Sequence, residues 1–314
     1  MKSKKMIPSK HFQLELVAEG VYAAVQKPEG CGLSNSGVID LGSRTVVFDT
    51  FLTPHAAEDL LFAAEELTNH PVNIVVNSHY HSDHTWGNQV FSSNAEIIST
   101  NTTRRLINTA GMSEYKWFKE NSPQLEALYG SGETVGNDSY QKYLMVYQQC
   151  VLKALTSLTI RLPNLTFTGR MKLFGSNHSV ELRAYSGGHT ASDTVLYIPQ
   201  ERIIFMSDLL SVGSHPYLVD GDPQELVRIL SEIKTMQPRV LIPGHGPPGD
   251  LHDLDLMIRY VGDLEKIAQR LYEKGDPEEK ISKIPIPKSY DRWEYPDLFY
   301  KNLRFFYLRL QRLP

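Results

Sequence analysis

The stretch that decides the fold is Asn77-Ser78-His79-Tyr80-His81-Ser82-Asp83-His84-Thr85-Trp86-Gly87-Asn88. It follows the apolar, β-branched run Val72-Asn73-Ile74-Val75-Val76, which predicts a buried strand. A loop that leaves a strand can turn its three histidines and one carboxylate toward one point. Imidazole nitrogens together with a carboxylate oxygen suit zinc, iron or manganese. A solvated polar loop is the alternative, and the position directly after a strand favours the metal site.

Three further motifs follow in chain order. His189 comes after a glycine pair, Asp208 ends an apolar run that begins at Ile203, and His245 lies between two glycines. Together with His-x-His-x-Asp-His, these motifs resemble the metallo-β-lactamase superfamily over about residues 20–250. The joint occurrence of four motifs is far more specific than any one of them.

The resemblance implies an α/β (α+β) fold, a four-layer αβ/βα sandwich of two mixed β-sheets with outer helices. Alternating strand and helix patterns in both halves of the chain agree with it. We expect one such domain over residues 12–250, with a helical insertion at about 108–160. Residues 251–314 are expected to form a helical C-terminal extension packed on that domain.

The resemblance also implies a ligand set for two zinc ions, with iron or manganese as alternative metals. Matched position by position, one ion would be held by His79, His81 and His189, the other by Asp83, His84 and His245, with Asp208 bridging them. Asp49, at the end of another expected strand, matches an aspartate that supports this site from behind. A turn-capping role is the alternative for Asp49.

The activity that the resemblance implies is hydrolysis by a hydroxide that bridges the two metals, acting on a small-molecule ester, thioester, lactone or amide. Asp83 and His215 are the catalytic candidates. His215 comes seven residues after Asp208 and could act as an acid or hydrogen-bond donor, although a surface histidine is the alternative. The sequence contains no Gly-x-Ser-x-Gly motif, so a serine nucleophile is not indicated.

Other functions of the same fold remain open. A phosphodiester hydrolase would share the same seven ligands. An iron oxidoreductase resembling persulfide dioxygenases is a second alternative, although such proteins typically leave one metal position empty. A binding module that has lost activity is a third. Zinc β-lactamases generally place cysteine or serine where this chain has Asp208, which argues against a dedicated β-lactamase.

Composition limits the partners. A net charge of -4 and a pI near 6.3 give no general attraction to nucleic acid, so no nucleic-acid partner is expected. The chain has no apolar run of about 20 residues, so no membrane partner is expected. The expected partner is a small-molecule substrate, and a homo-oligomer is left open.

The cysteines and the start of the chain bear on location. Cys31 and Cys150 show no paired spacing and are expected to be free thiols. The basic start Met1–Lys5 is followed by Met6–Lys10, which interrupts any apolar segment, so no signal peptide is expected. These features predict a cytoplasmic protein.

The expected insertion is rich in tyrosine, tryptophan and methionine. Ser122-Pro123 predicts the start of a helix that ends at Gly130, and Tyr140–Leu158 carries apolar residues at helical spacing. Since the insertion lies between segments that carry metal ligands, we expect it to form a wall of the substrate pocket and to favour substrates with an apolar group.

Overall fold

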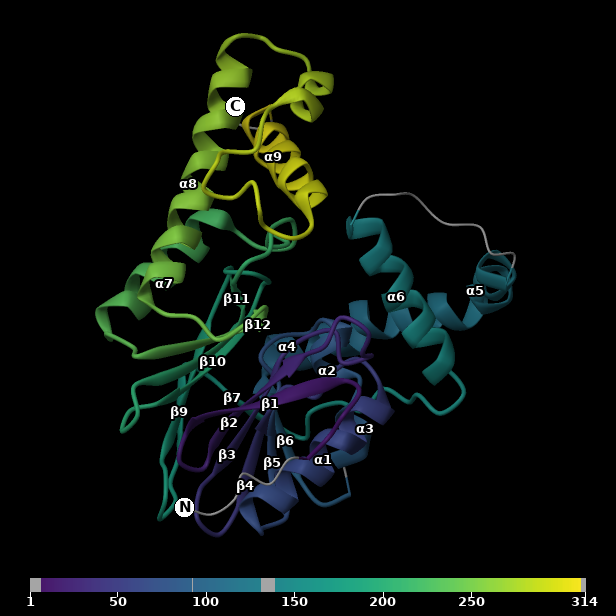
Figure 1. Ribbon diagram of the computed structural model, residues 1–314, viewed down its shortest axis with the longest axis vertical. Helices are drawn as coiled ribbons and strands as arrows, with labels where there is room; N and C mark the ends of the chain where they lie inside the picture. Colours follow the sequence, from purple (N-terminus) through teal and green to yellow (C-terminus); the bar gives the residue numbers. More distant parts are fainter. Residues whose placement is uncertain (1–6, 92, 131–138, 312–314) are drawn as a thin grey trace.

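Two β-sheets pack face to face in the computed structural model, which describes residues 7–91, 93–130 and 139–311. Helices cover the outer face of each sheet, and two further helical parts project from this sandwich (Figure 1). The α/β sandwich predicted from the sequence is therefore confirmed.

The first sheet has seven strands in chain order. Strands β1 to β4 pair antiparallel, and β4 to β7 pair parallel. Their bounds are β1 Phe12–Ala18, β2 Val21–Gln26, β3 Ser36–Asp40, β4 Thr45–Phe48, β5 Val72–Val76, β6 Glu96–Thr100 and β7 Leu165–Phe167. The parallel strands end at one edge of the sheet, where the loop after β5 carries the histidine motif.

The second sheet has five strands in the order β12-β11-β10-β9-β8, antiparallel except for the parallel pair β11 and β12. Their bounds are β8 Arg170–Leu173, β9 Val180–Tyr185, β10 Asp193–Ile198, β11 Ile203–Ser211 and β12 Val240–His245. Strand β11 is buried along its whole length, as its apolar first half, Ile203 to Met206, predicts; Ser207, Asp208 and Ser211 are buried polar residues in its second half.

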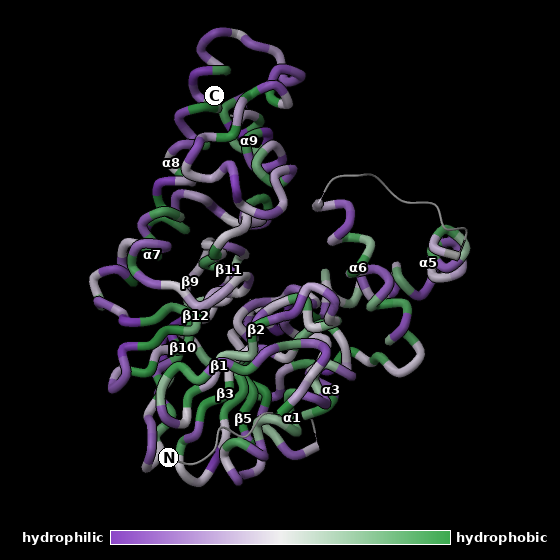
Figure 2. Tube along the Cα trace, in the orientation of Figure 1, coloured by the Kyte–Doolittle hydropathy of each residue, from purple (hydrophilic) through white to green (hydrophobic). Residues whose placement is uncertain are grey.

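Apolar residues of both sheets meet in the central core. Val46 and Ile39 of the first sheet and Leu182 and Phe205 of the second belong to one buried cluster. Figure 2 shows the hydrophobic stretches along β3 and β5 in this interior. A Cβ at Gly37 would come 2.4 Å from the Phe205 ring, so only glycine lets the two sheets approach this closely.

Helices close both outer faces. Helix α1 (Pro54–Thr68) covers the first sheet together with the short α3 (Asn88–Phe91), while α7 (Pro223–Thr235) and α8 (Leu251–Glu273) cover the second. The chain then passes through η2 (Glu278–Lys283) to α9 (Pro296–Gln311), which packs along α8. Among the described residues, no helix has both the length and the apolar character needed to cross a bilayer.

The segment between β6 and β7 is helical. It consists of α4 (Asn101–Leu106), the π-helical turn η1 (Ile107–Gly111), α5 (Met112–Gly130) and α6 (Ser139–Ala154). Pro123 lies inside α5, so the prediction that a helix starts at Ser122-Pro123 is wrong. The turns before Pro123 pack Phe118 against Trp86, and this contact favours a continuous helix over the intrinsic preference of proline.

Cys31 and Cys150 form a disulfide, so the prediction of free thiols is wrong. The two cysteines are 119 positions apart, and folding of α6 onto the loop after β2 brings their Cα atoms within 5.5 Å. Disulfides persist mainly in oxidising compartments, so the cysteines no longer support a cytoplasmic location. The first six residues, on which the expectation of no signal peptide partly rests, lie outside the described residues.

Breaking this disulfide should destabilise the protein. Closing a loop of this length restricts the unfolded chain, and removing such a link typically costs about 2–5 kcal/mol. We expect the Cys31→Ser/Cys150→Ser double variant to lose stability of this order in urea unfolding, and reduction of the wild type to have the same effect. Two reactive thiols in native, unreduced protein would contradict the pairing.

Candidate metal centre

The candidate ligands come from loops and strand ends at one rim of the sandwich. His79 and His81 lie between β5 and the single-turn helix α2 (Ser82–Thr85), which carries Asp83 and His84. The remaining three come from the second sheet or its loops: His189 between β9 and β10, Asp208 on β11 and His245 at the end of β12. Both sheets therefore contribute to one site.

The backbone around Asp208 and His245 departs from regular strand geometry. A Cβ at Gly244 would lie 1.8 Å from Asp208 Oδ1, so glycine is required before His245. Ser207, directly before Asp208, has a φ of 47°, in the left-handed region that is unfavourable for residues other than glycine. The register between β11 and β12 shifts at the same place. This local distortion turns Asp208 toward the histidines.

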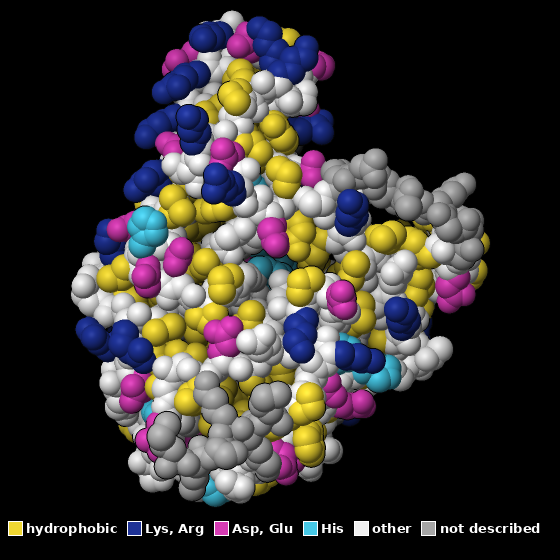
Figure 3. All heavy atoms as spheres, in the orientation of Figure 1, with side chains coloured by type: hydrophobic (Ala, Val, Ile, Leu, Met, Phe, Trp, Pro, Cys, Tyr) yellow, Lys and Arg dark blue, Asp and Glu magenta, His cyan; other side chains and the backbone are white. Residues whose placement is uncertain are grey.

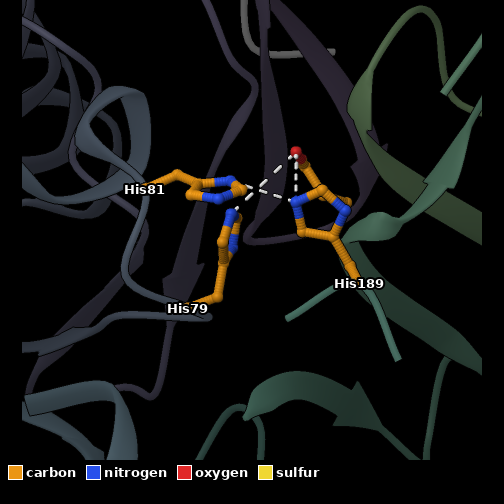
Figure 4. A group of neighbouring side chains, drawn as sticks. His79, His81 and His189 are labelled. Carbon is orange, nitrogen blue, oxygen red and sulfur yellow. Dashed lines mark hydrogen bonds and ion pairs between the residues drawn. The ribbon is translucent and has the colours of Figure 1, made fainter. Parts of the chain in front are cut away.

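The seven residues fall into two neighbouring groups. In each group, the potential ligand atoms lie within 4.8 Å of one another; one group is His79, His81, His189 and Asp208, the other Asp83, His84 and His245. Figure 4 shows His79 and His81, from the loop after β5, and His189, from the loop between β9 and β10, pointing toward one another. The structure thus brings together all seven residues that the sequence proposed as metal ligands.

Asp208 lies between the two groups. Its Oδ2 is 3.4 Å from His189 Nε2 in the first group and 3.3 Å from His245 Nε2 in the second. Its Oδ1 is 3.1 Å from His84 Nε2. One carboxylate therefore faces histidines of both groups, which is the arrangement that a bridging ligand requires.

The donor set fits metal ions. His79 Nδ1 is 2.9 Å from Ser78 Oγ and His84 Nδ1 is 2.8 Å from Asp49 Oδ2, so one nitrogen of each ring is engaged. The Nε2 atoms of both rings are buried and make no well-aligned hydrogen bond among the described residues, although His84 Nε2 lies 3.1 Å from Asp208 Oδ1. Buried polar atoms are rarely left without a partner, and metal-binding histidines typically anchor their second nitrogen in this way.

The ligand histidines differ in protonation: burial lowers the pKa of some, whereas in His81, His84 and His245 nearby carboxylates outweigh burial and raise the pKa. Burial lowers the pKa of His79 well below its ordinary value and that of His189 to about 3, so both rings are neutral at pH 7 and can donate a lone pair. Burial alone would raise the pKa of Asp208, but the nearby His245 and His84 outweigh it and hold this pKa well below the usual range. Asp208 is therefore a carboxylate.

Asp49 lies directly behind the histidine motif. Besides His84 Nδ1, its carboxylate accepts hydrogen bonds from the Ser78 backbone N–H at 2.8 Å and the Ser78 hydroxyl at 2.7 Å. The Ser207 hydroxyl, on the other sheet, donates to it at 3.0 Å. This buried carboxylate therefore orients His84 and ties the two sheets together, which matches the supporting role rather than a simple turn cap.

One family model and several solved structures match this chain. The family model described as the metallo-beta-lactamase superfamily matches residues 30–245, well over half of the chain. The chain belongs to this superfamily. Solved structures of the same fold include metallo-beta-lactamases from Pontibacter korlensis, with a TM-score of 0.58 at 18% identity, and from Erythrobacter litoralis, with a TM-score of 0.59 at 15% identity.

The match covers 80% of this chain and 99% of the Pontibacter korlensis chain, and 82% of this chain and 100% of the Erythrobacter litoralis chain. At these identities the likeness shows the fold alone. The superfamily model ends at His245, so α8 and α9 lie beyond the part that this chain shares with it.

Two supporting aspartates were missed at the sequence level. Asp220 Oδ2 accepts a hydrogen bond from the Tyr80 hydroxyl at 2.8 Å and lies 3.1 Å from His81 Nε2, which leaves His81 Nδ1 to face His189 Nε2 at 3.0 Å. Asp193 accepts from the His189 backbone N–H at 2.9 Å. No sequence motif marks Asp220, whereas the spacing from His189 could have indicated Asp193.

A cavity of about 270 Å³ opens onto the candidate ligands. Helix α6 provides one wall with Tyr140, Tyr143 and Tyr147, and Tyr295 and Leu298 contribute from the C-terminal extension. Figure 3 shows histidine atoms at the bottom of a hollow between the C-terminal helices and the α5–α6 pair. The insertion and the extension thus enclose the superfamily's metal rim.

His215 also lines this cavity but is held in the wall. Its Nδ1 is 3.0 Å from the Tyr260 hydroxyl, and the ring packs against Trp293 and Phe299. Burial lowers its pKa to about 4, partly opposed by the backbone of Tyr290. Because the ring is neutral at pH 7, it is unsuited to act as an acid, but its Nε2 is buried without a hydrogen-bond partner among the described residues. A role as hydrogen-bond donor to the substrate therefore stays a prediction.

Asp220→Asn should weaken metal binding at the group that contains His81. Loss of such a supporting carboxylate typically reduces metal affinity about 10–100-fold. Competition with a colorimetric zinc chelator measures this change directly. Asp291→Asn, at an exposed aspartate, is the matched control. Equal zinc affinity in both variants would show that Asp220 does not orient His81.

Proposed function

We propose that this protein is a dinuclear, zinc-dependent hydrolase of a small-molecule carboxylic ester, thioester, lactone or amide. The observation that carries the proposal is the position of Asp208 between two complete groups of ligands. A single-metal protein needs only one such group. The second complete group also favours hydrolysis over the mononuclear iron oxidoreductase alternative.

The residues have separable roles in this proposal. When bound, two metal ions would polarise the substrate carbonyl and make a water molecule nucleophilic at neutral pH. Asp83 lines the cavity with Oδ2 3.6 Å from both His84 Nε2 and His245 Nε2. In the proposal, its carboxylate would orient the attacking water, accept the proton of that water as the new carbon–oxygen bond forms, and return the proton to the leaving group as the bond to that group breaks.

The cavity lining favours a carboxyl derivative over a phosphodiester. No lysine or arginine is among the described residues that line it, while Glu114 adds a carboxylate. A phosphodiester would therefore find no side-chain counter-charge near the metals, whereas phosphoryl groups are usually bound by such cations. The aromatic walls instead suit an apolar portion of a neutral ester, thioester, lactone or amide.

Metal content tests the dinuclear proposal. We expect about two zinc ions per chain by elemental analysis, and a loss of both in Asp208→Ala because each group loses a shared ligand. His81→Ala and Asp83→Ala should each lower kcat by several orders of magnitude while circular dichroism shows an intact fold. A single iron ion, retained in Asp208→Ala, would instead support the oxidoreductase.

The aromatic wall should set substrate preference. Removing the ring in Tyr143→Ala takes away apolar contact worth about 1–3 kcal/mol, so kcat/KM for a phenylacetyl ester should fall about 10–100-fold. The acetyl ester with the same leaving group should be affected much less. Trp117→Ala, on α5 outside the cavity lining, is the control. Equal losses on both esters would contradict this preference.

A further inference from the structure

Glu114 is a carboxylate in the cavity wall that the proposed hydrolysis does not use. It projects from α5 into the cavity, where the Tyr147 hydroxyl donates a hydrogen bond to Oε1. Ser82 Oγ lies 2.8 Å from the same Tyr147 hydroxyl. Burial raises the pKa of Glu114, and the hydrogen bond from Tyr147 opposes this rise. The partners of this carboxyl group are thus hydroxyls rather than a cation.

The described lining of the cavity gives Glu114 no lysine or arginine as a counter-charge, although the nearby His81 also lowers the pKa of this carboxyl group. Among the described residues, no lysine or arginine forms an ion pair with Glu114. No lysine or arginine is among the described residues that line the cavity. Glu114 is partly buried, and a carboxylate with reduced access to water is stabilised by a facing cation. It can also accept more hydrogen bonds than the hydroxyls here provide. The cavity wall at Glu114 is therefore suited to a positive group carried by the ligand.

Three other tyrosine rings that line the same cavity suit such a group. Tyr140 and Tyr143 stack with centroids 6.1 Å apart, and Tyr295 packs 5.3 Å from Tyr143. The faces of aromatic rings attract cations, most strongly where water is excluded. Lys301 of α9 already shows this: its ammonium lies 4.6 Å from the centroid of Tyr217 and 5.5 Å from that of Tyr140, although Lys301 itself does not line the cavity.

We propose that the cavity selects substrates whose apolar portion carries an ammonium group, held against the tyrosine rings with Glu114 as its counter-charge. This inference rests on the proposed function and names the substrate class of the same site. The competing role for Glu114 is purely local, namely to fix the Tyr147 hydroxyl beside Ser82. The two roles differ in whether the charge of the substrate matters.

A matched pair of esters tests the inference. Both carry the same scissile bond and leaving group, and the acyl chain ends in trimethylammonium in one and in the isosteric tert-butyl group in the other. With metal-loaded wild type, we expect kcat/KM for the cationic ester to exceed that for the neutral ester at least about tenfold. The reason is that the ammonium group is attracted both by the carboxylate and by the aromatic rings. In Glu114→Gln the ratio should fall toward one.

Two further variants separate the roles. Glu120→Gln makes the same change at an exposed position on α5 and should keep the wild-type ratio. Tyr147→Phe keeps the ring but removes the hydroxyl that Glu114 accepts from, and it should also keep the preference for the cationic ester. A wild-type ratio near one, or a loss in Tyr147→Phe equal to that in Glu114→Gln, would overturn the inference.

Binding of phenyltrimethylammonium, measured by calorimetry, gives a readout that does not require hydrolysis. The Kd should be about tenfold weaker in Glu114→Gln than in wild type, with zinc content and circular dichroism confirming intact protein. If this dependence appears but no ester is hydrolysed, the proposed function fails and the cation site stands. If esters are hydrolysed but the Kd is the same in both proteins, the cation site fails alone.

Discussion

The position of Asp208 among histidines supplied by both halves of the chain is the constraint on which the rest of the structure depends. A buried carboxylate and a cluster of imidazoles with unpartnered nitrogens are costly to assemble unless a cation joins them. The fold nevertheless holds them together: Gly244 allows the close approach of β12, and Ser207 adopts a left-handed backbone conformation beside Asp208. Local strain of this kind persists where surrounding packing determines it.

Asp49 extends this constraint into the scaffold. It accepts hydrogen bonds from Ser78 behind the histidine motif and from Ser207 on the other sheet. The same carboxylate therefore orients His84 and sets the distance between the two sheets at the rim. Displacing one sheet against the other would break the contacts of Ser207 with Asp49 and Ser78, so the geometry of the site and the packing of the sheets are coupled.

The sequence predicted those features of the fold and site that depend on residues close together in the chain. The histidine motif, the glycines beside His189 and His245 and the alternating strands all act over a few residues, and the structure places them as expected. The Cys31–Cys150 disulfide was not predictable in this way, because only the docking of α6 brings the two cysteines together. Asp220 was missed for the same reason: its contact with His81 spans 139 positions, and no motif surrounds it.

The parts added to the shared fold give this protein its individual cavity. The disulfide fixes α6 to the core, so the tyrosines of that helix have a defined position above the candidate metals. Helix α9, beyond the superfamily match, lies across from them, and Lys301 contacts a tyrosine on α6. In the proposed function, the shared rim would supply the chemistry, while the helices between β6 and β7 and the C-terminal helices would select the substrate.

The most direct test of this account is a crystal structure of the zinc-loaded protein with anomalous diffraction measured at the zinc edge. The account predicts two anomalous peaks about 3.5–4 Å apart, one on each group of ligands, with Asp208 in contact with both. A single peak confined to one group, or zinc bound away from Asp208, would contradict it.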